Sequence, residues 1–202
     1  MLINKSIISR AVDILNLGGV VSFPTETVYA LAANPYNIDA MLRVYSMKGR
    51  NNNKPLALLV DSISMIEKIA ILDERSYKLL EKYAPGPLTI VLKLKDNTIY
   101  SSVIGGEDDT IGVRIPKHDV ALEIVNMLSK PVVATSANIS NQNSSITAQE
   151  VESIFGSQID LIIDGGKSEI GIGSTVIDLS TDKVKLLREG SISFNKILKL
   201  LN

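Results

Sequence analysis

Short apolar runs that stop abruptly at clusters of small polar residues constrain this chain more than any other feature. Residues 19–23 (Gly-Val-Val-Ser-Phe) give way at Pro24 to Thr-Glu-Thr, and residues 131–134 (Pro-Val-Val-Ala) give way to a stretch rich in Thr, Ser and Asn. Such runs are typical of buried strands, and a proline, which cannot donate to a sheet ladder, predicts the end of the first one. In open α/β sheets ligands bind in the crevice beyond the strand ends. The polar clusters are therefore candidates for a binding site.

The remaining segments predict one α/β domain. The spacing of apolar residues predicts helices over 5–17, 38–47, 63–71, 74–83, 120–128, 151–155 and 194–201. Further strands are predicted over 54–60, 88–94, 110–116, 161–164, 171–178 and 184–188. Because the helices fall irregularly between the strands, we expect a twisted mixed sheet, parallel and antiparallel, with flanking helices and one concave cleft. A chain of 202 residues fits a single domain over 1–202 better than two.

Composition excludes several classes of site and of partner. The chain has no cysteine and one histidine, His118, which excludes thiolate and multi-histidine metal sites. A net charge of −1 argues against a global basic surface for nucleic acid, although a local basic patch is compatible with it. The N-terminus lacks a signal-peptide pattern, and no apolar run approaches the length of a membrane span. We expect a cytoplasmic protein with no membrane contact and no protein-built metal site.

Two cations flank a glycine at the end of the helix predicted over 38–47. Lys48, Gly49 and Arg50 could approach an anion closely, because glycine lets the backbone come near. Alternatively, they are a solvated helix end, where cations suit the helix dipole. Residues 24–27 (Pro-Thr-Glu-Thr) are open to a similar alternative, a turn that starts the next helix. The two motifs together favour a site for a small polar molecule beside a phosphate.

Arg114 lies within the otherwise apolar strand predicted over 110–116, where an unpaired charge would be costly. Its neighbours on the same strand face, Gly112 and Pro116, offer no charge. The partner is therefore either an internal carboxylate, with Asp164 and Asp178 as candidates, or the carboxylate of a ligand held bidentately. We favour the ligand. His118, just beyond, is predicted to be a surface residue or a cap of the following helix rather than a catalytic group.

The polar stretch after the strand at 131–134 carries many hydroxyls and amides over residues 135–145. Small side chains and free backbone N–H groups suit phosphate oxygens. The alternative is a connecting loop rich in Ser and Asn, which composition alone would favour.

Taken together, the motifs resemble one known family, the YrdC-like threonylcarbamoyl-AMP synthases, over nearly the whole chain. The resemblance rests on seven motifs in the family's order: 23–29 (Phe-Pro-Thr-Glu-Thr-Val-Tyr), 48–50 (Lys-Gly-Arg), 85–89 (Pro-Gly-Pro-Leu-Thr), 112–116 (Gly-Val-Arg-Ile-Pro), 136–138 (Ser-Ala-Asn), 174–176 (Ser-Thr-Val) and 187–190 (Leu-Arg-Glu-Gly). Longer members carry a second, C-terminal domain, so the chain looks like the short, single-domain form. Leu59 stands where many members have histidine.

The resemblance assigns roles to particular residues. It implies that Thr27, Arg114 and Ser174 bind L-threonine, with Arg114 on its carboxylate. It implies that ATP is bound by Arg50, Thr110, Ser136, Ser144 and Arg188, and also by Lys48 and Asn138, which belong to the same motifs. No general base is visible in the sequence, so catalysis is expected to rest on positioning by Lys48, Arg50 and Arg114.

The resemblance also implies a reaction. Family members make L-threonylcarbamoyladenylate and pyrophosphate from L-threonine, bicarbonate or CO2, and ATP, which classes them as nucleotidyltransferases. The product passes to a transferase that forms threonylcarbamoyladenosine at tRNA position 37. Mg2+ carried on the phosphates is expected, and weak binding of RNA is possible. The alternatives are an RNA-binding module, or an accessory module, of the same fold without synthase activity.

Overall fold

The computed structural model describes residues 5–51, 55–95 and 109–201. In this part of the chain, nine strands form one mixed sheet in the order β7-β1-β2-β6-β3-β5-β4-β8-β9. Pairs β1/β7, β3/β5 and β4/β8 are parallel and the others are antiparallel. The sheet is therefore mixed, as predicted. The bounds are β1 (Val21–Pro24), β2 (Tyr29–Ala33), β3 (Ala57–Leu59), β4 (Leu88–Lys93), β5 (Thr110–Arg114), β6 (Val132–Ser136), β7 (Leu161–Ile162), β8 (Thr175–Asp178) and β9 (Lys185–Arg188).

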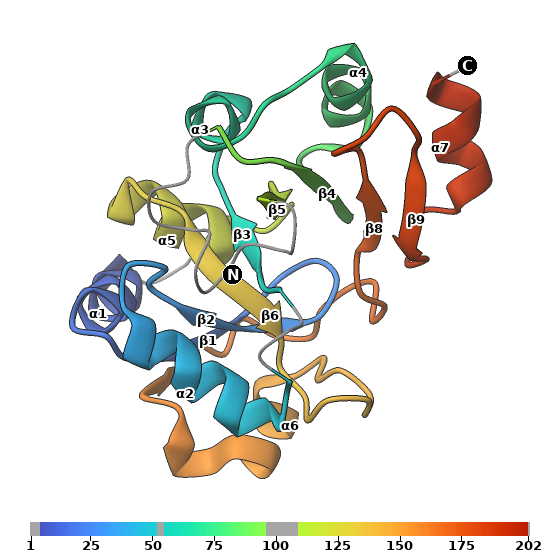
Figure 1. Cartoon of the computed structure of the whole chain (residues 1–202). Helices are drawn as coiled ribbons and strands as arrows, with labels where there is room; N and C mark the ends of the chain where they lie inside the picture. Colours follow the sequence, from blue (N-terminus) through green and yellow to red (C-terminus); the bar gives the residue numbers. More distant parts are fainter. Residues whose placement is uncertain (1–4, 52–54, 96–108, 202) are drawn as a thin grey trace.

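Helices cover both faces of the sheet (Figure 1). Their bounds are α1 (Lys5–Asn16), α2 (Ile38–Lys48), α3 (Ile63–Ile69), α4 (Glu74–Tyr83), α5 (Asp119–Leu128), α6 (Ala148–Phe155) and α7 (Phe194–Leu201), with a short 3-10 turn over Gly156–Gln158. Helices α1 and α5 form one core with residues such as Phe23 and Val132. The other five helices pack in a second core, around residues such as Leu58 and Val113. The predicted helices and strands are all present, with ends shifted by a few residues.

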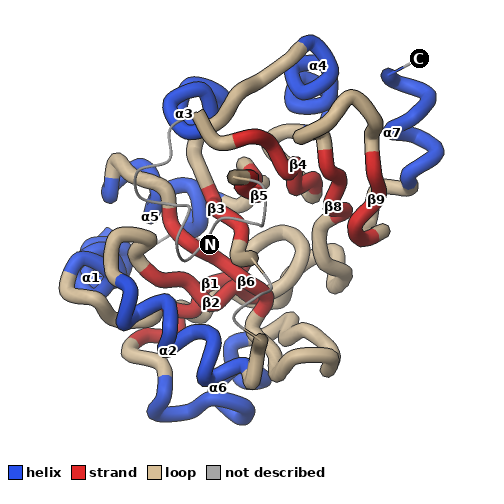
Figure 2. The backbone as a smooth tube through the Cα atoms, viewed as in Figure 1, coloured by secondary structure: helices blue, strands red, loops and turns tan. Residues whose placement is uncertain are grey.

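Among the described strands, β2 is the one that the sequence did not predict. Instead of leading to a helix, the polar turn after Pro24 reverses the chain, and β1 and β2 pair as an antiparallel hairpin (Figure 2). Thr25 makes this turn, because its backbone N–H and its Oγ1 both donate to Val28 O. Strand β2 is buried on both faces, so its run of Tyr, Ala and Leu carries no alternation that could reveal it.

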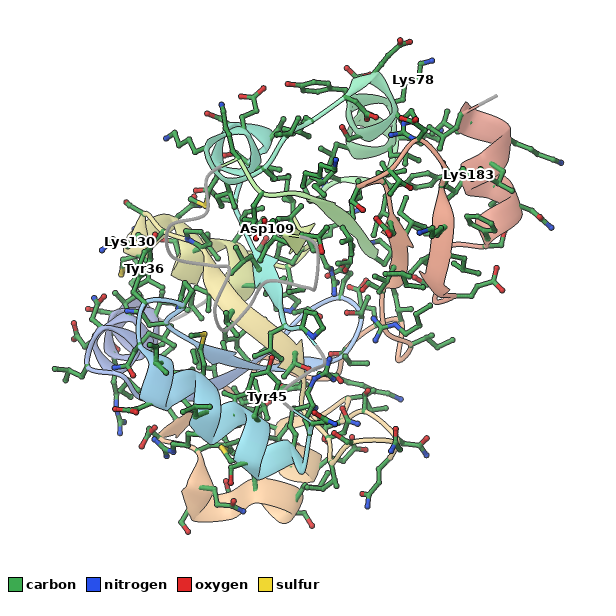
Figure 3. The ribbon with its side chains drawn as sticks, in the orientation of Figure 1. Tyr36, Tyr45, Lys78, Asp109, Lys130 and Lys183 are labelled. Atoms are coloured by element: carbon green, nitrogen blue, oxygen red, sulfur yellow. The ribbon has the colours of Figure 1, made fainter. Side chains whose placement is uncertain are left out.

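Side-chain capping sets the start of α5, which is one of the two roles predicted for His118. His118 caps α5 with its Nδ1 accepting from Val120 N at 3.3 Å. In the described ranges no helix combines the length and apolar character that a membrane-spanning helix needs. Residues 107–109 (Glu-Asp-Asp) form an acidic run, of which only Asp109 lies within the described residues (Figure 3).

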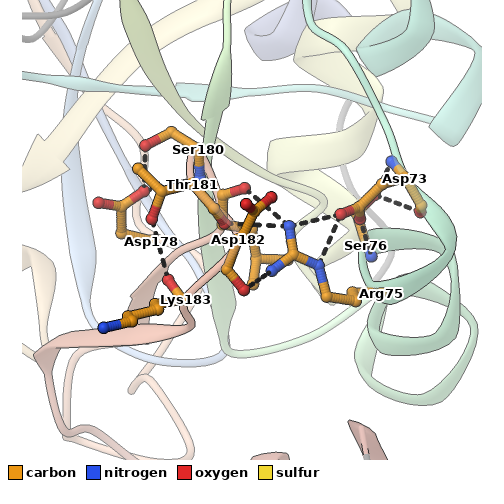
Figure 4. A network of polar contacts seen from close by, with 9 residues as sticks. Asp73, Arg75, Ser76, Asp178, Ser180, Thr181, Asp182 and Lys183 are labelled. Atoms are coloured by element: carbon orange, nitrogen blue, oxygen red, sulfur yellow. Dashed lines mark hydrogen bonds and ion pairs between the residues drawn. The ribbon is translucent and has the colours of Figure 1, made fainter.

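An arginine at the start of α4 ties that helix to the β8–β9 hairpin (Figure 4). Arg75 Nε donates to Asp73 Oδ2, and its two terminal nitrogens donate to the carbonyls of Leu179, Thr181 and Asp182. Asp178, at the end of β8, accepts from both the N–H and the hydroxyl of Ser180. These bonds fix the hairpin whose far ends carry Ser174 and Arg188.

Candidate active site

A cavity of about 370 Å³ opens on one face of the sheet, within the range of small-molecule pockets. Its floor is made by alternate residues of neighbouring strands, because side chains two apart point to the same face. The floor residues include Ala57 and Leu59 on β3, Thr110, Gly112 and Arg114 on β5, Thr89 and Val91 on β4, Ala134 and Ser136 on β6, and Val176 and Asp178 on β8. Their neighbours in the chain point into the core behind the sheet. The sheet therefore brings residues from distant motifs together.

Arg114 lies at one end of the cavity in an internal ion pair. Its Nη2 is 2.8 Å from Glu26 Oε1, and both side chains are less than a tenth exposed. Its Nη2 also donates to Thr27 Oγ1 at 2.9 Å, and its Nε donates to Gly86 O at 3.2 Å. Burial lowers the pKa of Arg114, and Glu26 opposes that shift. Nη1, the remaining nitrogen of the guanidinium, makes no hydrogen bond to the described residues.

This ion pair corrects part of the expectation about Arg114. Asp164 and Asp178 are wrong as internal partners, because the carboxylate beside Arg114 belongs to Glu26. The strand pattern could not reveal this, since Glu26 lies in the turn of a hairpin that was not predicted. The ligand carboxylate that we favoured stays a prediction. The geometry excludes a bidentate contact through Nε and Nη2, but Nη1 can still donate to a ligand oxygen.

The hydroxyls of Thr25 and Thr27 have a defined direction. Thr25 Oγ1 donates its one proton to Val28 O at 2.7 Å. Thr27 Oγ1, 2.8 Å away, must therefore donate to Thr25 Oγ1. Since Thr27 Oγ1 also accepts from Arg114, one lone pair remains. Thr27, which lines the cavity, can thus only accept a hydrogen bond from a ligand, such as one from an amine or a hydroxyl.

A second hydroxyl network faces this end from β4 and β8. Thr89 Oγ1 and Ser174 Oγ are 2.7 Å apart and buried. Arg188 donates through Nε and Nη2 to Ser174 O, and through Nη2 to Ser174 Oγ. The pKa of Arg188 is lowered by burial and then by the positive charges of Arg114 and Arg50. Three guanidinium groups therefore influence one small cavity.

Arg50 reaches the cavity from the end of α2. The helix ends at Gly49, whose left-handed backbone (φ 55°) lets its N–H donate to Ser46 O while Arg50 N donates to Tyr45 O. Arg50 Nη2 donates to Pro55 O at 3.0 Å. Tyr45 lies on the same helix (Figure 3). Burial raises the pKa of Tyr45, and the positive charge of Arg50 opposes that shift.

Lys48 lies behind the cavity rather than in its lining. Its side chain is 1% exposed, and Nζ donates to the carbonyls of Ser136 and Asn138. Asn138 is committed within its own loop, since Nδ2 donates to Ile139 O and Gln142 O. Burial lowers the pKa of Lys48 to about 7, and the charge of Arg50 adds to this. Lys48 and Asn138 shape the loop that presents Ser136 and Ser144.

The predicted site residues thus divide into two groups. Those lining the cavity are Thr27, Arg50, Thr110, Arg114, Ser136, Ser144, Ser174 and Arg188, while Lys48 and Asn138 lie behind it. Sequence reasoning gave no role to Thr89 or Glu26, although both stand in quoted motifs. Thr89 and Val91 alternate with the apolar Ile90 and Leu92, a signal that could have placed Thr89 on the open face.

No group of three or more His, Cys, Asp or Glu side chains in the described ranges could hold a metal ion. The donors around the cavity are arginines and hydroxyls, which suit phosphate and carboxylate oxygens rather than a cation.

Comparison with known proteins identifies the family. The family model Sua5_yciO_yrdC, described as telomere recombination, matches residues 13–190. The chain belongs to this family. The threonylcarbamoyl-AMP synthase of Pyrococcus abyssi is 38% identical over 192 residues, covering 95% of this chain and 56% of that protein. A putative threonylcarbamoyl-AMP synthase of Methanocaldococcus jannaschii is 36% identical over 187 residues, covering 93% and 86%.

A solved structure of the Sua5_yciO_yrdC family carries the same fold. The crystal structure of P. abyssi Sua5 complexed with L-threonine superposes with a TM-score of 0.93 at 38% identity, covering 99% of this chain and 58% of that one. The predicted mixed sheet with flanking helices, and the resemblance to this family, are thereby confirmed. The chain spans only a little over half the length of the P. abyssi protein.

Proposed function

We propose that this chain is a threonylcarbamoyl-AMP synthase, a nucleotidyltransferase that makes L-threonylcarbamoyladenylate and pyrophosphate from L-threonine, bicarbonate or CO2, and ATP. Family membership and the names of the relatives support this proposal. The observation that carries it is a single cavity with two chemically different ends. One end holds the Arg114–Glu26 pair with the Thr27 hydroxyl, and the other holds Arg50 with Ser136 and Ser144.

The first end suits an amino acid. Nη1 of Arg114 would take the carboxylate, and the lone pair of Thr27 Oγ1 would take an N–H or O–H of the substrate. The hydroxyls of Thr89 and Ser174 share one hydrogen bond, so one of their two protons is left for a substrate oxygen. An amino acid with a side-chain hydroxyl would use all three groups: Arg114 Nη1, Thr27 Oγ1 and the free proton of the Thr89–Ser174 pair.

The second end suits a triphosphate. Arg50 would neutralise charge at this end as the bond to the α-phosphorus forms and pyrophosphate leaves, and Arg188 would add its positive charge from beside Ser174 at the first end. Thr110, Ser136 and Ser144 would orient the nucleotide. Lys48 and Asn138 would hold the loop of Ser136 and Ser144 from behind the cavity. Any Mg2+ would reach the site on the phosphates, with waters as its other ligands, because the lining offers no cluster of carboxylates.

The chemistry needs little beyond this positioning. The threonine amine attacks CO2, loses a proton to water and becomes a carbamate. A carbamate oxygen then attacks the α-phosphorus of ATP, and the bond to the pyrophosphate breaks. The residues would bring the two substrates together and offset charge. The product, an unstable mixed anhydride, must be consumed by a transferase that acts on tRNA in the same compartment, and we infer the cytoplasm.

Omission of single substrates tests the proposal. Pyrophosphate release should require L-threonine, bicarbonate and ATP together, and should fall to background when any one is withheld. Release from ATP alone would contradict the proposal, and tRNA binding without any release would favour the RNA-binding alternative.

A further inference from the structure

The cationic side chains around the cavity differ in how their charge is balanced. Arg114 is paired with the Glu26 carboxylate at 2.8 Å. Arg188, within the described residues, donates only to the neutral oxygens of Ser174. Glu26 therefore balances the charge of Arg114, while Arg188, which is bonded to Ser174 at the same end of the cavity, keeps a full positive charge.

Glu26 is buried with few polar partners, and backbone hydrogen bonds fix the turn that carries it. Its side chain is 5% exposed, and neither carboxylate oxygen accepts a hydrogen bond from the described residues, so the guanidinium is its one ionic contact there. Its backbone carbonyl accepts from Ile170 N, and that of Thr27 accepts from Gly171 N, which joins the turn to the segment before β8. A buried carboxylate with so few partners costs stability, so packing alone does not account for Glu26.

We propose that Glu26 is a specificity-determining and positioning residue: by neutralising Arg114 it makes that end of the cavity select a zwitterionic amino acid and reject phosphate anions. This proposal rests on the proposed function and names a determinant of its substrate choice. A bare buried guanidinium would bind any oxyanion, including the phosphates of ATP and the pyrophosphate product. With Glu26 behind it, the guanidinium keeps Nη1 for one carboxylate oxygen, and further negative charge is repelled.

The same carboxylate fixes the direction of the guanidinium. Because Glu26 and Thr27 both contact Nη2, the Nη1 edge is free of bonds to the described residues. Loss of the charge should therefore have two effects, weaker threonine binding and stronger phosphate binding at the same place. A role confined to packing would produce neither effect selectively.

Calorimetry on three proteins tests the proposal: wild type, Glu26→Gln and the control Glu169→Gln. Glu169 is exposed, and its charge reaches the same region, as its effect on the pKa of His118 shows. The dissociation constant of L-threonine is measured without phosphate and in the presence of increasing inorganic phosphate. In Glu26→Gln, phosphate should compete with threonine about tenfold more strongly than in wild type, because a nearby like charge has been removed. The control should change by less than about twofold.

Equal phosphate competition in wild type and Glu26→Gln would overturn the proposal, as would equal strengthening in the control. If Glu26→Gln does not fold, Glu26→Asp replaces it. Glu26→Asp keeps the negative charge but places it farther from the guanidinium. Phosphate should therefore compete with L-threonine about threefold more strongly than in wild type. No change in a folded Glu26→Asp would overturn the proposal in that case. If wild type binds no threonine at all, the proposed function itself is wrong.

Discussion

At the scale of single residues, Arg114 shows how an internal partner changes what a substitution should do. Because Arg114 and Glu26 are buried together, removing the arginine leaves a buried carboxylate without its counterion. Arg114→Gln should therefore lower the free energy of unfolding by roughly 3–5 kcal/mol, measured by denaturant titration. The double variant Arg114→Gln/Glu26→Gln should recover much of this loss, because both charges are gone. An Arg114→Gln protein as stable as wild type would show that the pair does not matter to the fold.

Substitutions at Arg50 test whether the second end of the cavity binds ATP. Arg50→Ala should weaken ATP binding by about 1.5–3 kcal/mol, the range for a hydrogen bond to a charged group. Arg50→Lys should recover only part of this, since an ammonium lacks the planar pair of donors. Titration calorimetry with ATP measures both. Unchanged affinity in both variants would remove Arg50 from the nucleotide site.

Lys48 should make stability depend on pH. Its pKa is about 7 in the folded protein and near 10.5 when the chain unfolds. Between these values the unfolded chain binds a proton that the folded protein has released, so the free energy of unfolding should rise with pH from about 7 to about 10.5. Denaturant titrations of wild type and Lys48→Met at pH 7 and pH 9 isolate this contribution. The wild type should gain more stability than the variant, and parallel changes would contradict the lowered pKa.

At the scale of elements, two helix ends use the same left-handed geometry with different residues. Gly49 ends α2 at φ 55° and Ser129 ends α5 at φ 53°. Glycine adopts this conformation freely and serine does not. The left-handed cap at Gly49 sets the backbone direction at Arg50. The geometry of this cap therefore positions a residue of the cavity as well as ending the helix.

Opposite substitutions at these two caps should have opposite effects. A Cβ at Gly49 would meet no atom within 4 Å, so the cost of Gly49→Ala is backbone strain alone, about 1 kcal/mol. Ser129→Gly relieves the same strain and should stabilise the protein by roughly 0.5–1 kcal/mol. Thermal melting measures both. A stabilising Gly49→Ala would show that the cap differs from the one described.

The sequence predicts most elements because their apolar periodicity is strong, and its limits have physical causes. Strand β2 is buried on both faces, so it has no alternation to detect. The pairing of Glu26 with Arg114 joins residues far apart in the chain through a turn that depends on that strand. The cavity residues could be named from the family resemblance, but the position of Lys48 behind the cavity depends on packing alone.

At the scale of the whole molecule, the sheet order explains how the site forms. Strands β6, β3, β5, β4 and β8 are neighbours in space although the chain visits them in another order. Each contributes alternate side chains to one face, so motifs from residues 27 to 188 meet at one cavity. The two ends of that cavity offer different groups, an ion pair with hydroxyls at one end and Arg50 with two serines at the other, which suits two different substrates.

The most direct test of this account uses labelled bicarbonate. The protein is incubated with L-threonine, ATP and 13C-bicarbonate, and the products are analysed at once by mass spectrometry. The account predicts an adduct of threonine and AMP that contains one additional carbonyl group and carries one 13C atom, in step with pyrophosphate release. An adduct of threonine and AMP without the labelled carbon, or pyrophosphate without any adduct, would contradict it.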